Sequence, residues 1–386
     1  MLSLVVPMAI GYGLISVIAS GHARLTMGER IAFSYPLGAA AITLEMALWP
    51  LLKIPYSFVG LVLPWIILGG VAVIVPKIRQ HLKAPVTFQR WEPLSAVIAV
   101  WLVWKVFWLL AEIALRPINA WDAVAYWSLM GKIFFYESTW SPALASLTRG
   151  ASQPLFNPLI QTWTALSLGA WNENWVQLPF AILFISLVAA TGVKMERRGS
   201  SRSGWIAAGL MMGLPFAAMH AIVAYSDLPL AVFHGMAYLL LLIYLNEKDK
   251  RILVLSAIFI ILSIWAKRHG IIYTGVWGVC VFLIDLKGEK IRSIPVGLWT
   301  MAGAGALFLA GLFWTRIGVI ADWGWHMDRL SEIVPVLTAR LFTYGHWNVL
   351  WALALWAPWL PFLLFALVTK TWLLCANWWT AAWMST

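Results

Sequence analysis

The chain is a succession of apolar stretches, most of which approach the length of a membrane-crossing helix. Such a helix needs about 20 apolar residues to cross the hydrocarbon core of a bilayer. Eleven stretches come near that length, at residues 1–20, 31–51, 56–76, 93–115, 175–194, 204–224, 229–245, 252–266, 270–285, 295–315 and 346–369. The sequence therefore predicts an all-α polytopic membrane protein with about 11 transmembrane helices.

The composition excludes the other common classes of protein. Of the 386 residues, 62% are hydrophobic and only 11% are charged, whereas a soluble domain has about 25% charged residues. So few polar side chains cannot cover a soluble globule of this size. The 27 tryptophans fit a membrane protein, since tryptophan concentrates at the membrane interface. Cys280 and Cys375 both lie in apolar stretches, which argues against a disulfide scaffold.

The distribution of basic residues predicts which loops face the cytoplasm. Segments 76–92 and 194–203 each carry four lysines or arginines, so we expect both on the cytoplasmic side. They can share a side only if the stretch 154–170, interrupted by Pro154 and Pro158, enters the membrane and returns to the outer side. Most of the basic residues behind the net charge of +11 are thus explained as topology signals in predicted cytoplasmic loops. The charge therefore gives no reason to expect a nucleic-acid partner.

The first long outer loop, residues 116–153, carries the first candidate site. From Trp121 onward, apolar residues recur at helical spacing and form one stripe, made up of Val124, Trp127, Met130 and Phe134. Asp122 and Tyr126 lie four residues apart and share a different face. We therefore expect an amphipathic helix on the outer membrane surface that presents an acid beside an aromatic ring. A solvated acid or a helix cap is the simpler explanation of Asp122.

Two short outer turns carry the remaining prominent charges. In the turn AYSDLPLA, Asp227 is either a helix N-cap or a carboxylate that faces the same outer cavity as Asp122 and holds a cation. The turn WAKRHG places Lys267, Arg268 and His269 on the predicted outer side, against the positive-inside rule. These three residues predict a seat for an anionic group, especially a phosphate. Snorkelling of the basic side chains towards lipid headgroups is the alternative.

Other polar residues carry weaker signals. Glu45, Lys105 and Glu112 lie inside predicted spans and should face protein or water, without an assigned role. His220 and His234 are expected to be core histidines. The remaining candidate site residues are Arg149, Gln153, Asn157 and, in the last outer loop, His326.

Four motifs in this order carry a resemblance: the WDAVAYW helix, the QPLFNPLIQTW element, the YSDLPLA turn and the WAKRHG turn. Together they resemble the GT-C membrane glycosyltransferases, in particular bacterial relatives of the protein mannosyltransferase and aminoarabinose transferase group. The resemblance covers about residues 110–290. It implies transfer of a sugar from a polyprenyl-phosphate carrier to an acceptor on the extracytoplasmic face of the bacterial inner membrane. The acceptor would be an envelope glycan, a lipid or a protein.

The resemblance also implies roles for particular residues. Asp122 matches the catalytic base of the family's first loop, and Asp227 matches a second-loop acid that helps hold a metal or the acceptor, with Tyr126 nearby in the first loop. A divalent metal is thereby left open as a cofactor. The donor phosphate would be bound by the basic turn, residues Lys267, Arg268 and His269.

The chain also departs from the family's pattern. Gln153-Pro154 and Asn157-Pro158 resemble the family's HPPL or YPPL element but lack its histidine or tyrosine, and His269 stands where the basic motif has an acid. Relatives usually place the catalytic loop after the first span, whereas three extra spans precede it here. The chain is therefore predicted to be one integral membrane domain, divided into extra spans at 1–92, a GT-C-like core at 93–290 and C-terminal spans with an outer loop at 291–386.

The inventory of charged residues fits this chemistry. Phosphate leaves readily once its charge is stabilised, so one carboxylate and a few cations suffice. A glycoside hydrolase would need paired carboxylates instead. Two alternatives remain open: a glycan polymerase or ligase that uses a lipid-diphosphate-linked oligosaccharide, and a polytopic transporter or lipid-linked sugar flippase. Transporters commonly contain inverted repeats, and no internal repeat is evident in the sequence.

Overall fold

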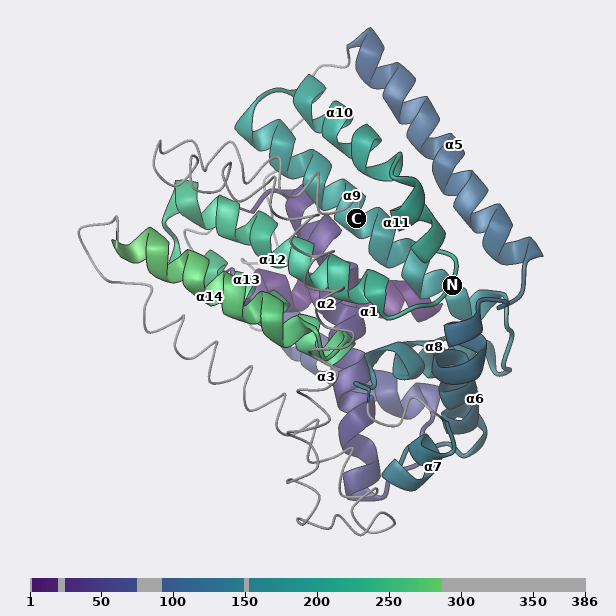
Figure 1. Cartoon of the computed structure of the whole chain (residues 1–386). Helices are drawn as coiled ribbons and strands as arrows, with labels where there is room; N and C mark the ends of the chain where they lie inside the picture. The colour runs from purple at the N-terminus through teal and green to yellow at the C-terminus, as the bar shows by residue number, and fades with distance from the viewer. Residues whose placement is uncertain (1, 20–24, 75–91, 149–152, 287–386) are drawn as a thin grey trace, which may run out of the picture. The chain divides into compact units, whose positions relative to one another are not determined.

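The computed structural model describes residues 2–19, 25–74, 92–148 and 153–286 (Figure 1). All described residues belong to one compact unit of the chain. Across these ranges the protein is built of helices and contains no β-strand. The predicted spans at 295–315 and 346–369 and the candidate residues Arg149 and His326 lie outside the described residues.

Four helices of the described part are long and apolar enough to cross a membrane. They are α2 (Met27–Leu48) with the 3-10 helix η1 (Trp49–Leu52), α5 (Pro93–Leu115), η3 (Trp175–Gln177) with α9 (Leu178–Arg198), and α12 (Asp227–Glu247). Shorter apolar helices are α1 (Leu2–Ile18), α3 (Phe58–Ile74) and α14 (Gly270–Leu286), and α13 spans Lys250–Ala266. These apolar helices indicate a membrane protein, so the prediction of an all-α membrane protein is confirmed at this coarse level.

The predicted span 204–224 is interrupted. Its first part is α10 (Ser201–Met212) and its second part is the short helix α11 (Pro215–His220). Leu214, between them, has an extended backbone (φ −67°, ψ 109°), because the proline that follows disfavours a helical conformation in the residue before it. A turn then leads from α11 into α12. The interruption thus separates α10 from α11, and the turn that precedes Asp227 follows α11.

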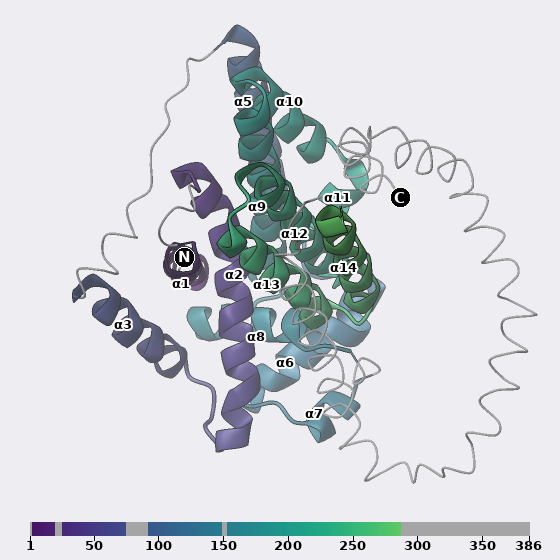
Figure 2. The same ribbon diagram turned by 90° about the vertical axis from the view of Figure 1, so that its left-hand side faces the viewer.

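Helices α1 and α2 pack against each other at very close range (Figures 1 and 2). A Cβ atom on Gly11 would overlap the Ser34 carbonyl oxygen, and one on Gly38 would overlap that of Pro7. Small residues at a helix crossing allow such contact between membrane helices. The buried Arg30 guanidinium donates a hydrogen bond to Ser16 Oγ (3.1 Å) across the same interface. This packing makes α2 a fixed support for the helices around it.

The helix bundle has two ends that differ in their side chains. At the first end, the start of α2 meets the ends of α9 and α12, and we call it the arginine end, defined by Thr26, Glu29, Lys194, Arg197 and Glu247. At the other end, the start of α12 meets the end of α13. We call this the loop end, defined by Asp122, Tyr225, Asp227 and Lys267. The 21 residues of α12 connect the two ends, which separates them by about 30 Å at 1.5 Å per residue.

Helix α8 (Phe156–Leu168) is short and buried from Phe156 to Ala165. Near its start, Asn157 Nδ2 donates to the Ala224 carbonyl oxygen, just before α12. In its middle, Trp163 Nε1 donates to the carbonyl oxygen of Ser3, near the start of α1. After it, Gln177 Nε2 donates to the Arg116 carbonyl oxygen, just beyond α5. Both flanks of α8 therefore contact segments at the loop end of the bundle.

Candidate functional site

The segment around Asp122 contains a π-helix. Ala123–Trp127 forms this wider turn, closed by a hydrogen bond from the Ser128 N–H to the Ala123 carbonyl oxygen, and α6 (Ser128–Tyr136) follows. Trp127, Met130 and Phe134 are buried as the predicted stripe requires, but Val124 is 49% exposed. Val124 lies within the π-turn, and a side chain that faces lipid from the membrane surface is exposed in the protein alone. Single π-turns within helices often occur at functional sites.

Asp122 is exposed and directly precedes this π-helix, and Tyr126 is half-buried one turn later. The Asp122 carboxylate makes no hydrogen bond or ion pair within the described ranges. Its backbone N–H donates a long hydrogen bond (3.4 Å) to the Tyr225 hydroxyl oxygen, 103 residues further along the chain. The first outer loop and the turn before α12 are thus brought together.

Asp227 forms an ion pair with Lys267. The distance from Lys267 Nζ to Asp227 Oδ1 is 2.6 Å, and the two side chains are 21% and 49% exposed respectively. The capping explanation of Asp227 is wrong, since Ser226 occupies the N-cap position and Asp227 is the first residue of α12. A negative charge in that first turn is still favourable for the helix dipole. Two of the predicted site turns therefore meet through their charged side chains.

The three residues of the basic turn are not equivalent. Lys267 follows the last residue of α13 and is neutralised by Asp227. Arg268 is half-buried, and in the described part of the chain its side chain has neither a hydrogen-bond partner nor an ion-pair partner. His269 is exposed. Arg268 is therefore the cation of this turn that is free to bind an anion.

Tyr225 is the residue of the site that sequence reasoning missed. Its hydroxyl accepts the hydrogen bond from Asp122, and its ring packs edge-on against His220 at 5.9 Å between ring centroids. The next residue, Ser226, is buried, and its Oγ has no hydrogen-bond partner among the residues that the structure describes. The motif YSDLPLA contained the signal, since a tyrosine two residues from the acid stands at the same turn.

A buried layer of amides lies next to this turn. Asn157 is fully buried, its Nδ2 donates to the Ala224 carbonyl oxygen (2.9 Å), and its Oδ1 accepts from Gln161 Nε2 (2.6 Å). Gln153 is half-buried, and its Oε1 lacks a partner in the described part. Asn157 therefore belongs to the loop end but is not exposed there, unlike Asp122 and Asp227.

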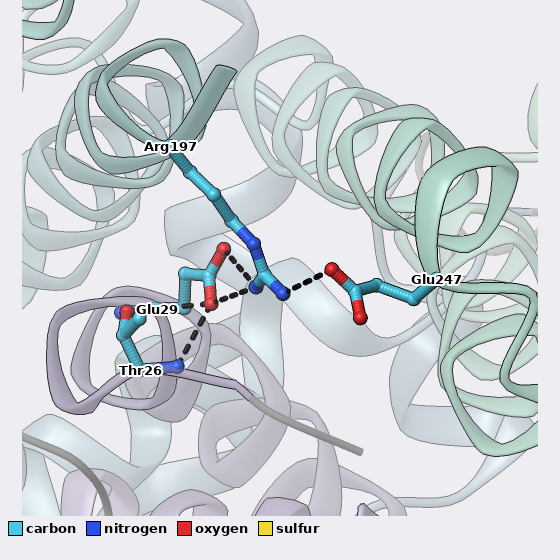
Figure 3. Close-up of polar contacts among 4 residues, drawn as sticks. All are labelled: Thr26, Glu29, Arg197 and Glu247. Atoms are coloured by element: carbon cyan, nitrogen blue, oxygen red, sulfur yellow. Dashed lines mark hydrogen bonds and ion pairs between the residues drawn. The ribbon is translucent and has the colours of Figure 1, made fainter. Parts of the chain in front are cut away.

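The arginine end contains a second polar cluster, which Figure 3 shows. Arg197 Nη1 contacts both carboxylate oxygens of Glu29 (2.9 and 2.7 Å), and Arg197 Nη2 contacts Glu247 Oε1 (2.7 Å). Glu29 also closes a capping box, since the Thr26 N–H donates to its Oε2 at 2.8 Å. The Lys194 ammonium is 1% exposed, without a hydrogen-bond partner among the described residues. From the sequence, Lys194 and Arg197 were interpreted only as topology signals.

The other charged and histidine residues have local partners. Glu112 pairs with Arg116 (3.2 Å), and Lys105 lies over the rings of Trp101 and Trp108. Glu45 accepts a hydrogen bond from Trp65 Nε1. The ring nitrogen Nδ1 of the buried His220 lies 2.9 Å from the Phe216 carbonyl oxygen, and His234 stacks on Tyr273. Among the described residues of this group, His220 contacts the loop end, through the ring of Tyr225.

The described residues contain no group of three or more His, Cys, Asp or Glu side chains that could hold a metal ion. Asp227 already accepts from the Lys267 ammonium, which a cation at this carboxylate would have to displace. The donor set around Asp227 in the described part of the chain therefore does not fit a resident divalent metal. In comparisons with protein-family models, curated proteins and solved structures, no match to this chain was found.

Proposed function

We propose that the chain is an integral-membrane glycosyltransferase of the GT-C type, with about 11 transmembrane helices. It transfers a sugar from a polyprenyl-phosphate carrier to an acceptor, with Asp122 as the general base. The observation that supports this proposal is that three segments meet at the loop end. The segment with Asp122 contacts Tyr225, and Asp227, which lies two residues after Tyr225 in the same turn, pairs with Lys267 of the basic turn. These are the turns whose motifs resemble that family, and they are distant in the sequence.

The reaction follows from the charges at this end. Asp122 takes the proton of an acceptor hydroxyl, and the acceptor oxygen attacks the anomeric carbon of the donor sugar. The bond from that carbon to the phosphate oxygen breaks, and the phosphate leaves with the bonding electron pair. A positioned base typically contributes about 10²–10⁴-fold to the rate. Direct displacement in a single step inverts the configuration at the anomeric carbon.

The developing phosphate charge requires cations that are available for binding. Arg268 supplies a planar guanidinium without a competing partner in the described ranges, and such a group binds phosphate in a bidentate manner. Lys267 is already paired with Asp227, but an exposed ion pair is worth only about 0–1 kcal/mol. Lys267 can therefore turn from Asp227 to the phosphate at low cost.

The positive-inside rule sets the orientation of the bundle in this proposal. Lys194 and Arg197 belong to the segment 194–203, which carries four basic residues, and both lie at the arginine end. The arginine end then faces the cytoplasm of a bacterial inner membrane, and the loop end faces outward. Carrier and acceptor would meet at the outer leaflet, next to Asp122.

Replacement of Asp122 by Asn tests the proposal. Cells that express the parent, the Asp122→Asn variant or a control are compared by mass spectrometry of their envelope glycolipids. The control is Glu137→Gln, which changes another exposed carboxylate 15 residues further along the same loop. We expect the glycosylated product to fall by at least about 100-fold with Asp122→Asn and to persist with Glu137→Gln. Unchanged product in a folded Asp122→Asn protein would overturn the assignment.

A transporter or flippase of lipid-linked sugars is the second candidate. The interruption between α10 and α11 favours it, because discontinuous helices line the binding sites of many transporters. Proteoliposomes distinguish the two candidates. Movement of a labelled lipid-linked sugar between leaflets, without any sugar transfer, would support the transporter and exclude the transferase.

A further inference from the structure

The turn between α11 and α12 holds a residue in an unfavourable backbone conformation. Ala224 has φ = +54°, in the left-handed region, although it carries a Cβ atom. That region is disfavoured for residues other than glycine, because Cβ crowds the neighbouring carbonyl oxygen. Such a conformation persists only where the surrounding contacts impose it. Some neighbour must therefore hold this turn in place.

Asn157 is the neighbour that contacts the turn at this residue. Its Nδ2 donates to the Ala224 carbonyl oxygen at 2.9 Å, and the side chain is fully buried. The orientation of the amide is set from the other side, since Asn157 Oδ1 accepts from Gln161 Nε2 at 2.6 Å. A carbonyl oxygen can only accept, so the amide must present its NH₂ group to Ala224.

Helix α8, which carries Asn157, is itself fixed. Thr162 Oγ1 donates to the Gly131 carbonyl oxygen of α6 at 3.0 Å, and Trp163 Nε1 donates to the carbonyl oxygen of Ser3 at 3.0 Å. The hydrogen bond from Asn157 thus comes from a rigid element and not from another loop. Such a bond can define the position of a turn that would otherwise relax.

The residues that follow Ala224 are those that join the loop end. The Tyr225 hydroxyl accepts from the Asp122 N–H, Ser226 is buried, and Asp227 pairs with Lys267. A change in the backbone of Ala224 would redirect all three residues together. One buried amide therefore governs how the Asp227 turn meets the two other turns.

We propose that Asn157 is a positioning residue: its hydrogen bond to Ala224 holds the left-handed turn and so sets where Tyr225 and Asp227 lie relative to Asp122 and Lys267. Because Asn157 is fully buried, it acts through the turn and not by contact with a substrate. Its effect on catalysis rests on the glycosyl transfer proposed above, whereas its effect on the turn does not.

A cysteine at position 226 reports on the turn. Cys280 and Cys375 are first replaced by Ser, and the rate of maleimide labelling of Ser226→Cys is measured on the purified full chain in detergent. Ser226 is 1% exposed, so labelling should be slow. Asn157→Ala should speed it about tenfold, because the strained turn loses its hydrogen bond. Adding Ala224→Gly should return the rate towards that of the parent, because glycine adopts a positive φ without a steric penalty.

A matched control separates this effect from general loosening. Gln177 is another buried amide at the loop end, and its Nε2 donates to backbone carbonyls of Arg116 and Glu173 instead. Gln177→Ala should leave labelling at 226 unchanged. If Asn157→Ala does not fold, Asn157→Leu fills a similar volume without a donor and should give the same acceleration.

Three results would overturn the proposal: unchanged labelling in the folded Asn157 variants, equal acceleration by Gln177→Ala, or no rescue by Ala224→Gly. In the glycolipid assay, Asn157→Ala should lower product at least about tenfold and Ala224→Gly should restore it. A further outcome is that labelling responds as expected while neither Asp122→Asn nor Asn157→Ala changes the glycolipids. In that case the proposed function is wrong, but the role of Asn157 in positioning the turn is supported.

Discussion

Glu29 at the arginine end and Asp122 at the loop end hold their negative charges in opposite environments. At the arginine end, Glu29 is fully buried, and both of its carboxylate oxygens accept from Arg197. At the loop end, the Asp122 carboxylate is exposed and has no partner in the described part of the chain. The half-buried Arg268 side chain likewise has no hydrogen-bond partner there. Saturated, buried charges stabilise one arrangement of helices. Exposed charges without partners are available to a ligand, and this difference is why we propose the loop end as the candidate functional site.

The arginine end also shows what the saturated charges connect. Glu29 lies in the first turn of α2, Arg197 in the last turn of α9 and Glu247 at the last residue of α12. One guanidinium therefore ties three helix ends together (Figure 3). The other ends of α2 and α12 carry no comparable link in the described ranges, and there the turns meet through single contacts instead. If the proposed function holds, the firmly linked arginine end would face the cytoplasm, and the loop end would be the end that admits lipid-linked ligands.

Arg197→Ala should produce the largest effect on stability. It leaves Glu29 buried without its counter-charge, and loss of one partner of a buried pair costs about 3–5 kcal/mol. Thermal unfolding of the purified protein in detergent measures the loss. Arg198→Ala is the control, because Arg198 is the exposed next residue and has no ion-pair partner among the described residues.

A second substitution sharpens that result. Adding Glu29→Gln to Arg197→Ala removes the stranded negative charge, so part of the lost stability should return. Equal melting temperatures for the Arg197 and Arg198 variants would contradict the description of Arg197, Glu29 and Glu247 as a structural cluster of paired charges.

At the loop end, Arg268→Ala should act on ligand binding and not on folding. A hydrogen bond to a charged group is worth about 1.5–3 kcal/mol, so affinity for a short polyprenyl phosphate such as farnesyl phosphate should fall about 10- to 100-fold. Lys267→Ala should weaken binding less, because Lys267 must first leave Asp227. Isothermal titration with the purified variants gives both values. A larger loss for Lys267→Ala than for Arg268→Ala would reverse the assigned order.

Some features of the two ends could be predicted from the sequence alone. Helices could be predicted because an apolar stretch in a membrane must satisfy its backbone hydrogen bonds internally, and a helix does so within a single segment. The charged residues of the loop end could be predicted as well, since Asp122, Asp227 and Lys267 stand out as exceptions in an apolar chain. A charge that opposes the general pattern needs a local reason, and that reason can be sought without a structure.

Contacts between distant segments could not be predicted in this way. The apolar spacing from Trp121 onward predicted a helix but not the π-turn at Ala123–Trp127. The bond from Asn157 to Ala224 joins residues 67 positions apart, and Glu29 and Arg197 are 168 apart. A basic residue near the end of a span reads as a topology signal whether or not it pairs, so Arg197 gave no sign of its role.

Asp227→Asn should have the smallest effect on stability, although it breaks an ion pair just as Arg197→Ala does. The Asp227–Lys267 pair is partly exposed, with side chains 49% and 21% accessible, and water can replace the lost partner. Such pairs contribute about 0–1 kcal/mol, and screening by salt reduces this further. We therefore expect a melting temperature close to that of the parent. Asp249→Asn serves as the reference, because Asp249 is a half-buried N-cap acid before α13 and asparagine is an equally good N-cap residue. A loss as large as that of Arg197→Ala would show that the loop end is also a structural clamp, and the distinction between the two ends would then fall.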